Sequence, residues 1–250
     1  IKKKNKKMKG KVYLAMDIET TGQYLGRNAM IAVGMVVMDD EMNILKNFTV
    51  CLKENGKERE ERCMSEFWGK QPAELFDNIM KNGIDPSIAM NSLVDWLLDV
   101  EITYGDRLVV LSDNPSYDVA WINYYLSTYS TRPMLYYGWN EQKQEYEYRR
   151  IWDTDSVFHG ALAMKKGEIV EWGLEKELDV QNVKWSNSHV PEEDASNIAA
   201  NYILFVKNNC ETVTVPVLKK SKTNSSSSEE EEDKTLEIKS FSEEESEKTD

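Results

Sequence analysis

The sequence predicts an α/β fold, and two features of its apolar pattern support that prediction. Three β-rich apolar runs, Val12–Ile18, Ala29–Met38 and Ile44–Leu52, follow one another with short connections, which is typical of an antiparallel meander. A fourth run, Arg107–Leu111, passes through the polar turn Ser112–Ser116 into a helical segment. This order of strand, tight turn and helix is typical of α/β folds, which bind ligands at the ends of such strands.

Two helices are expected between the meander and the fourth strand. Apolar residues recur at helical spacing over Ser65–Met80 and over Ser87–Val100, and each segment has a serine at a suitable start. The charged stretch Lys53–Arg62, which precedes them, predicts a loop.

The second half of the chain predicts further helices and one polar connection. Helices are expected over Tyr117–Tyr129, Asp155–Met164 and Glu192–Val206, the last with apolar residues along one side. Between the first two of these helices, Gln142–Arg150 is a polar excursion.

Composition divides the chain into an arm, a body and a tail. Residues 1–11 form a Lys-rich arm, residues 12–209 form the folded domain, and residues 210–250 become a Ser- and Glu-rich tail that we expect to be disordered. The tail could be a kinase substrate, although a solubilising extension is the preferred explanation. The body is acidic too, within a net charge of −13. It should bind duplex phosphate poorly unless bound divalent cations add positive charge.

Cysteines and apolar runs indicate an intracellular protein without a membrane span. Cys51, Cys63 and Cys210 are an odd number, lie far apart and have no metal-binding spacing, which favours a reducing compartment. No apolar run approaches the roughly 18 residues needed to cross a bilayer. We expect a cytoplasmic protein with no membrane partner and no small-molecule cofactor. A homodimer and a phage or viral origin stay open.

Asp17 and Glu19 end the first predicted strand, in the sequence DIETTG. Because side chains alternate across a strand, both carboxylates project to the same side, where they repel each other unless a cation lies between them. This geometry favours a metal site. A solvated strand end followed by a turn explains the segment equally well.

Two later segments place acids and a histidine at helix starts. Asp118 follows the fourth strand in the sequence SDNPSYD, and Asp194 lies in the first turn of the last helix, five residues after His189. Taken alone, an acid in a first helical turn is more often explained by capping and the helix dipole. A single histidine before a helix is more often a surface residue than a base.

Together the three segments resemble the DEDD superfamily of exonucleases, in its branch with a catalytic histidine. The resemblance runs in order from Tyr13 to about Val206. It implies an RNase H-like fold, with a mixed five-stranded sheet whose first three strands are antiparallel and which helices flank. It also implies a pair of Mg²⁺ or Mn²⁺ ions and a general base at His189. The implied metal ligands, which count as catalytic residues too, are Asp17, Glu19, Asp118 and Asp194.

The sequence SEFWGKQP is similar to one helix of the ribonuclease T-like exonucleases, which include phage exonuclease A. In those relatives this helix lies beside the terminal nucleotide. Trp68 and Gln71 are therefore expected to contact substrate, although a core position explains Trp68 equally well. Thr20, Asn114 and Tyr117 are further substrate-binding candidates beside the motif acids. An aromatic ring stacked on a terminal base contributes about 1 to 3 kcal/mol.

The resemblance implies a metal-dependent 3'-5' exonuclease that removes nucleoside 5'-monophosphates from single-stranded or 3'-overhanging nucleic acid. RNA and DNA are not distinguished, because a 2'-hydroxyl is sensed by a few hydrogen bonds that spacing does not reveal. The alternative is a catalytically silent RNase H-like interaction domain with a partner-binding acidic tail, and the complete set of acids argues against it. Asp113 departs from the family, which often carries Gly or His there, and its role stays open.

Overall fold

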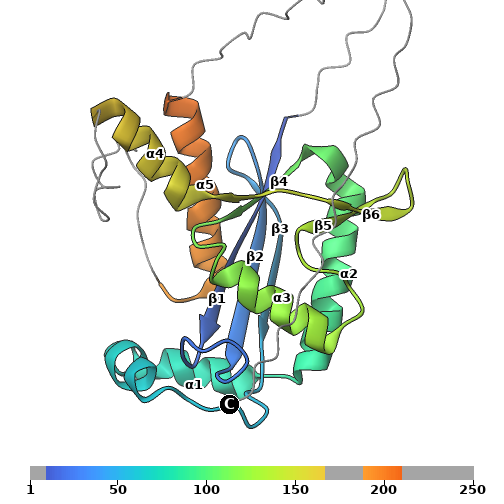
Figure 1. Ribbon diagram of the computed structural model, residues 1–250. Helices are drawn as coiled ribbons and strands as arrows, with labels where there is room; N and C mark the ends of the chain where they lie inside the picture. Colours follow the sequence, from blue (N-terminus) through green and yellow to red (C-terminus); the bar gives the residue numbers. More distant parts are fainter. Residues whose placement is uncertain (1–9, 167–187, 210–250) are drawn as a thin grey trace, which may run out of the picture. The chain divides into compact units, whose positions relative to one another are not determined.

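The computed structural model describes residues 10–166 and 188–209 of the chain (Figure 1). The predicted tail and the predicted Lys-rich arm, apart from Gly10 and Lys11, lie outside these residues. No helix in the described ranges is both long and apolar enough to cross a membrane. The strands are β1 (Val12–Thr20), β2 (Met30–Asp39), β3 (Ile44–Cys51), β4 (Leu108–Ser112), β5 (Tyr137–Asn140), β6 (Glu145–Tyr148) and β7 (Ile151–Asp153). The helices are α1 (Ala73–Asn82), α2 (Pro86–Tyr104), α3 (Asp118–Tyr129), α4 (Thr154–Lys166) and α5 (Pro191–Asn209), with the short turns η1 (Cys63–Phe67), η2 (Trp68–Lys70) and η3 (Gly105–Arg107).

The main sheet has five strands in the order β3-β2-β1-β4-β7. β1 pairs antiparallel with β2, and β2 pairs antiparallel with β3, as expected of the meander. β1 pairs in parallel with β4, and β4 with β7. The predicted mixed five-stranded sheet with three antiparallel strands is therefore confirmed.

Helices cover both faces of this sheet (Figure 1). On one face Tyr13 and Ala15 of β1 share a buried cluster with Ala195 and other residues of α5. On the other face Leu14 and Met16 join a larger cluster with residues of α2 and α3. β1 is therefore buried on both sides, and its odd-numbered positions face α5.

The predicted helix over Ser65–Met80 is interrupted in the structure. η1 is a single π-helical turn, η2 is a 3₁₀ turn, and α1 begins only after an extended residue, Gln71, with ψ of 160°. Pro72 explains the break, because proline disfavours the helical conformation of the residue before it. α2 also starts earlier than predicted, since the carboxylate of Asp85 caps it by accepting a hydrogen bond from the Ser87 amide at 2.9 Å.

The polar excursion predicted at Gln142–Arg150 contains half of a β-hairpin. β5 and β6 form a separate antiparallel pair, in which Trp139 lies opposite Tyr146 with ring centroids 5.3 Å apart. Cross-strand aromatic pairs of this kind stabilise antiparallel strand pairs. The sequence did not predict this hairpin, because frequent charged residues between the aromatics obscure the alternation of apolar and polar residues that is typical of a strand.

A close backbone approach at Gly34 fixes the start of α5 against the sheet. Gly34 of β2 lies opposite Asp17, and a Cβ there would come 2.1 Å from the carbonyl carbon of Pro191. The carboxylate of Glu192 accepts hydrogen bonds from Asn47 and Thr49 of β3, each at 2.6 Å. The first turn of α5 is thus held directly over the end of β1.

We predict that Gly34→Ala lowers the free energy of unfolding by about 1 to 3 kcal/mol, because the added methyl group forces the α5 backbone away from β2. Gly160→Ala is the matched control: Gly160 lies in α4 with no atom within 4 Å of an added Cβ. That substitution should stabilise the protein by about 0.5 to 1 kcal/mol, since alanine is the better helix former. Denaturant unfolding monitored by circular dichroism measures both. Equal stability of Gly34→Ala and the wild type would contradict this account of how α5 is anchored.

Candidate active site

Asp17 and Glu19 lie on the face of β1 that α5 covers. They continue the odd-numbered positions that begin with Tyr13 and Ala15, as the alternation of a strand requires. Glu19 is 5% exposed, although it lies close to the end of the strand. The pair therefore projects under the first turn of α5 rather than into bulk water.

The turn after β4 brings a second group of acids to the same place. Ala15 of β1 pairs with Leu111 of β4 in parallel, so the residues that follow Leu111 lie beside Asp17. The Ser112 hydroxyl donates a hydrogen bond to the Asp118 carboxylate at 2.9 Å, and the Asp118 amide donates to the Asn114 carbonyl at 3.0 Å. Asp118 is 5% exposed, so this turn presents its carboxylate inward.

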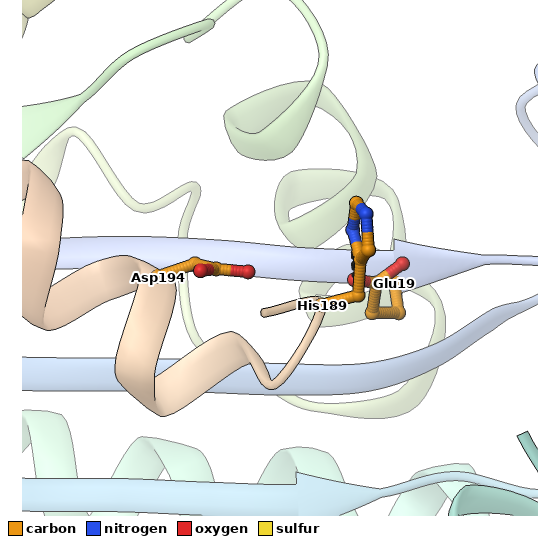
Figure 2. Close-up of side chains that lie close together, drawn as sticks. All are labelled: Glu19, His189 and Asp194. Carbon is orange, nitrogen blue, oxygen red and sulfur yellow. Dashed lines mark ion pairs between the residues drawn. The ribbon is translucent and has the colours of Figure 1, made fainter. Parts of the chain in front are cut away.

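The segment that enters α5 supplies the histidine and the last acid. The Ser188 amide donates to the Asp194 carboxylate at 3.0 Å, which closes a loop around His189. His189 has a φ of 54°, in the left-handed region that non-glycine residues rarely occupy. This conformation turns its ring towards β1, where Nδ1 lies 3.5 Å from Glu19 Oε1. Figure 2 shows Glu19, His189 and Asp194 gathered between the end of β1 and the start of α5.

Burial and mutual repulsion dominate the electrostatics of the acids. Burial raises the pKa of Asp17 well above its ordinary value, and the charges of Asp118 and Glu19 raise it further. The pKa of Asp118 is raised well above its ordinary value too, first by burial and then by Asp113. These carboxyl groups resist ionisation together unless positive charge arrives.

His189 and Glu19 influence each other in opposite directions. Burial raises the pKa of Glu19, and the contact with His189 partly offsets that increase. The contact with Glu19 raises the pKa of His189, and desolvation of the ring opposes it. The imidazole is therefore a stronger base than an exposed histidine.

All five residues proposed for the chemistry line one cavity of about 690 Å³: Asp17, Glu19, Asp118, His189 and Asp194. Among the substrate-binding candidates, Thr20, Asn114 and Tyr117 line it as well. The Tyr117 hydroxyl lies 2.8 Å from the Thr20 hydroxyl, so these two side chains form one polar corner.

Trp68 and Gln71 do not line this cavity. Trp68 is 4% exposed and donates its indole N–H to the Thr20 carbonyl at 2.9 Å, so it occupies a core position, the alternative that explained it equally well in the sequence. Phe67 lines the cavity instead, with its ring centroid 4.6 Å from that of His189. The π-helical turn of η1 causes this change of position, because it alters which side chain points inward.

Sequence reasoning assigned no role to several residues of the cavity wall. Asp113 lines the cavity and shares a hydrogen bond with Asp118, while burial raises its pKa. Arg62 and Lys70 also line it, at either end of the turns η1 and η2. Pro72 was the sequence signal that could have exposed the broken helix and, with it, the altered wall.

The sheet order and the flanking helices define an RNase H-like α/β fold, and comparison with solved structures confirms this predicted class. No family model matches the chain, and no curated protein matches it.

The fold is shared with E. coli exonuclease I. The zinc-bound crystal structure of its complex with single-stranded DNA aligns with a TM-score of 0.58 at 15% identity, over 80% of this chain and 41% of that chain. Its complex with a dA16 oligonucleotide aligns with a TM-score of 0.60 at 14% identity, over the same 80% and 41%. The present chain therefore spans about two fifths of the length of exonuclease I. At such identity, the likeness concerns the fold.

We predict that Asp17→Asn stabilises the protein in the presence of EDTA, and that the gain grows as the pH rises. Below the ordinary pKa of 3.8, Asp17 is protonated in both the folded and the unfolded chain. Above it, the unfolded chain ionises while the folded chain resists, so the wild type loses stability as the pH rises towards the raised pKa. The amide introduced by the substitution does not titrate and has no such dependence. Chemical unfolding at a series of values between about pH 4 and pH 8 measures the difference.

Asp77→Asn on the exposed face of α1 is the control for this experiment. It removes one negative charge without touching the cavity, so it reports what the loss of a surface charge does by itself. If the free energies of unfolding of Asp17→Asn and the wild type differ by the same amount throughout this range, the pKa of Asp17 is not raised by burial and its neighbours.

Proposed function

We propose that this protein is a metal-dependent 3'-5' exonuclease that removes nucleoside 5'-monophosphates from single-stranded or 3'-overhanging RNA or DNA. The observation that carries this proposal is the convergence of four acids and one histidine, from distant parts of the sequence, in one cavity. This cavity lies at the end of β1 in a fold shared with exonuclease I, whose structures include single-stranded DNA complexes.

The donor set fits divalent cations that prefer oxygen ligands. Atoms of Glu19, His189 and Asp194 lie within 4.8 Å of one another. Asp17 and Asp118 have no lysine or arginine ion pair within the described ranges, although both are crowded by other carboxylates. Carboxylate oxygens suit Mg²⁺ or Mn²⁺. Asp17, Glu19, Asp118 and Asp194 would hold a pair of such ions.

When bound, the ions supply two kinds of chemistry: they lower the pKa of water, and they stabilise negative charge on the attacking and leaving oxygens. The protein supplies the proton transfer. His189 accepts the proton of the attacking water, and the contact with Glu19 holds the ring in place while raising its basicity. The edge-to-face packing of Phe67 against His189 restricts the ring from the other side.

The first test is a cleavage assay with 5'-labelled oligonucleotides. We predict that the wild type shortens single-stranded DNA or RNA from the 3' end in Mg²⁺, releases nucleoside 5'-monophosphates, and is inactive in EDTA. Asp17→Asn should reduce cleavage to background, because a carboxylate of the cation site is lost. Parallel DNA and RNA substrates decide the sugar preference, and circular single-stranded DNA detects endonuclease activity.

Two outcomes would contradict the proposal. Equal cleavage by the wild type and Asp17→Asn would assign the activity to a contaminant. Binding of nucleic acid or protein without any cleavage would favour the silent interaction domain.

The second test concerns His189. We predict that His189→Ala lowers turnover by about 10² to 10⁴-fold, the usual contribution of a general base, while Mn²⁺ affinity stays nearly unchanged. Steady-state kinetics and Mn²⁺ titration followed by electron paramagnetic resonance measure the two properties separately.

His159→Ala is the matched control, because His159 is the other histidine of the chain and does not line the cavity. It should leave turnover within about twofold of the wild type. A large loss of Mn²⁺ affinity in His189→Ala would instead make His189 a metal ligand, which its proximity to Asp194 permits.

A further inference from the structure

Positive side chains are unevenly distributed around the cavity. Within the described ranges, the lysine and arginine side chains that line it are Lys70 and Arg62 alone. A phosphodiester strand would meet strong repulsion at the acids, so its backbone needs cations nearby to enter. The acidic side chains of the lining are Asp17, Glu19, Glu66, Asp113, Asp118, Asp155 and Asp194.

Both cations belong to one short stretch of chain, residues 62–70, which we call the η wall. Arg62 immediately precedes η1, and Lys70 ends η2. Phe67 lies between them in the sequence and contacts the His189 ring. Figure 1 shows this stretch beside the C-terminal end of β1. The two cations therefore line the cavity from the same stretch of chain as Phe67 and Glu66.

The η wall is tied to the residue that follows Glu19. Trp68 donates its indole N–H to the Thr20 carbonyl at 2.9 Å, and the Cys63 thiol lies 3.8 Å from the same oxygen. Because Trp68 is buried, these contacts anchor the wall next to the end of β1.

The charges of the η wall are available to a ligand. Lys70 is exposed, and its side chain makes no ion pair or hydrogen bond within the described part of the chain. The Arg62 side chain is 58% exposed, and its contact with Glu60 is long, at 3.9 Å. By contrast, nearby Arg59 is engaged by two hydrogen bonds to Glu54, at 2.6 and 2.9 Å.

We infer that Arg62 and Lys70 bind backbone phosphates of the single strand on the 5' side of the scissile linkage, with Phe67 contacting the sugar or base between them. This inference rests on the proposed exonuclease function and adds the path by which the strand enters. A guanidinium can bind phosphate in a bidentate manner, and an ammonium acts as a point charge. An aromatic ring between them tolerates any base.

The test measures how binding depends on salt. Full-length protein carrying Asp17→Asn, which prevents cleavage, is titrated with 5'-fluorescein-labelled single-stranded DNA in Mg²⁺ over a series of KCl concentrations. Each phosphate contact contributes a slope of about −0.7 to the plot of log affinity against log salt. Adding Arg62→Gln and Lys70→Gln should reduce the magnitude of the slope by about 1.4 and weaken binding about tenfold at low salt. Binding of a nucleoside 5'-monophosphate should not change.

Lys53→Gln with Lys81→Gln is the matched control, because these exposed lysines lie outside the cavity and their removal changes the net charge equally. Arg62→Lys with Lys70→Arg should retain the wild-type slope. Thermal unfolding confirms that each variant is folded. Equal slopes for the η-wall variant and the control would overturn the inference. In that case the exonuclease proposal would still stand, provided that the wild type cleaves single strands. A wild type that neither binds nor cleaves single strands overturns both.

Discussion

Buried carboxylates repel one another at the end of the sheet where β1, β4 and α5 meet, and the geometry of the site depends on this repulsion. Another buried acid, Glu101, is instead paired with arginine. At the far end of α2, the Glu101 side chain is 2% exposed and is paired with the fully buried Arg132 at 2.6 Å and with Arg149 at 3.6 Å. No such arginine accompanies Asp17 or Asp118 within the described ranges. This contrast between one compensated buried acid and a group of uncompensated acids is an observation that supports the proposed cation site.

Close packing of the backbone holds the mutually repelling acids in defined positions. The acids come from segments that are distant in the sequence, and each is tied to the frame by its own contact. Gly34 admits the first turn of α5 next to Asp17, the Ser112 hydroxyl holds Asp118, and the Ser188 amide holds Asp194. The left-handed backbone at His189 adds a small conformational cost, which the packing around the loop offsets. Such strain is typical of positions where orientation of a side chain matters more than local stability.

Local patterns predicted the first four strands of the main sheet, whereas the family resemblance supplied the fifth strand and the full set of acids. Alternation along β1 places Asp17 and Glu19 on one face, and a strand followed by a tight turn places Asp118 beside them. The wall of the cavity was not predictable in the same way. Trp68 and Phe67 are adjacent aromatics, and a single π-helical turn decides which one faces the cavity. Helical spacing alone carries no information about such a turn, or about the indole hydrogen bond from Trp68 to the distant Thr20 carbonyl.

The residues of the η wall are contiguous in the sequence, whereas those of the acid cluster are not. The acids are scattered along the chain from β1 to α5, so any change in the chemistry must preserve contacts between several distant segments. The wall is one uninterrupted stretch between β3 and α1, fastened to the sheet chiefly through Trp68 and the Thr20 carbonyl. Residues 62–70 can therefore be varied as one segment, provided that the buried Trp68 and the Phe67 ring against His189 are kept. A library confined to the exposed positions of that stretch would alter the proposed strand path without changing the acids.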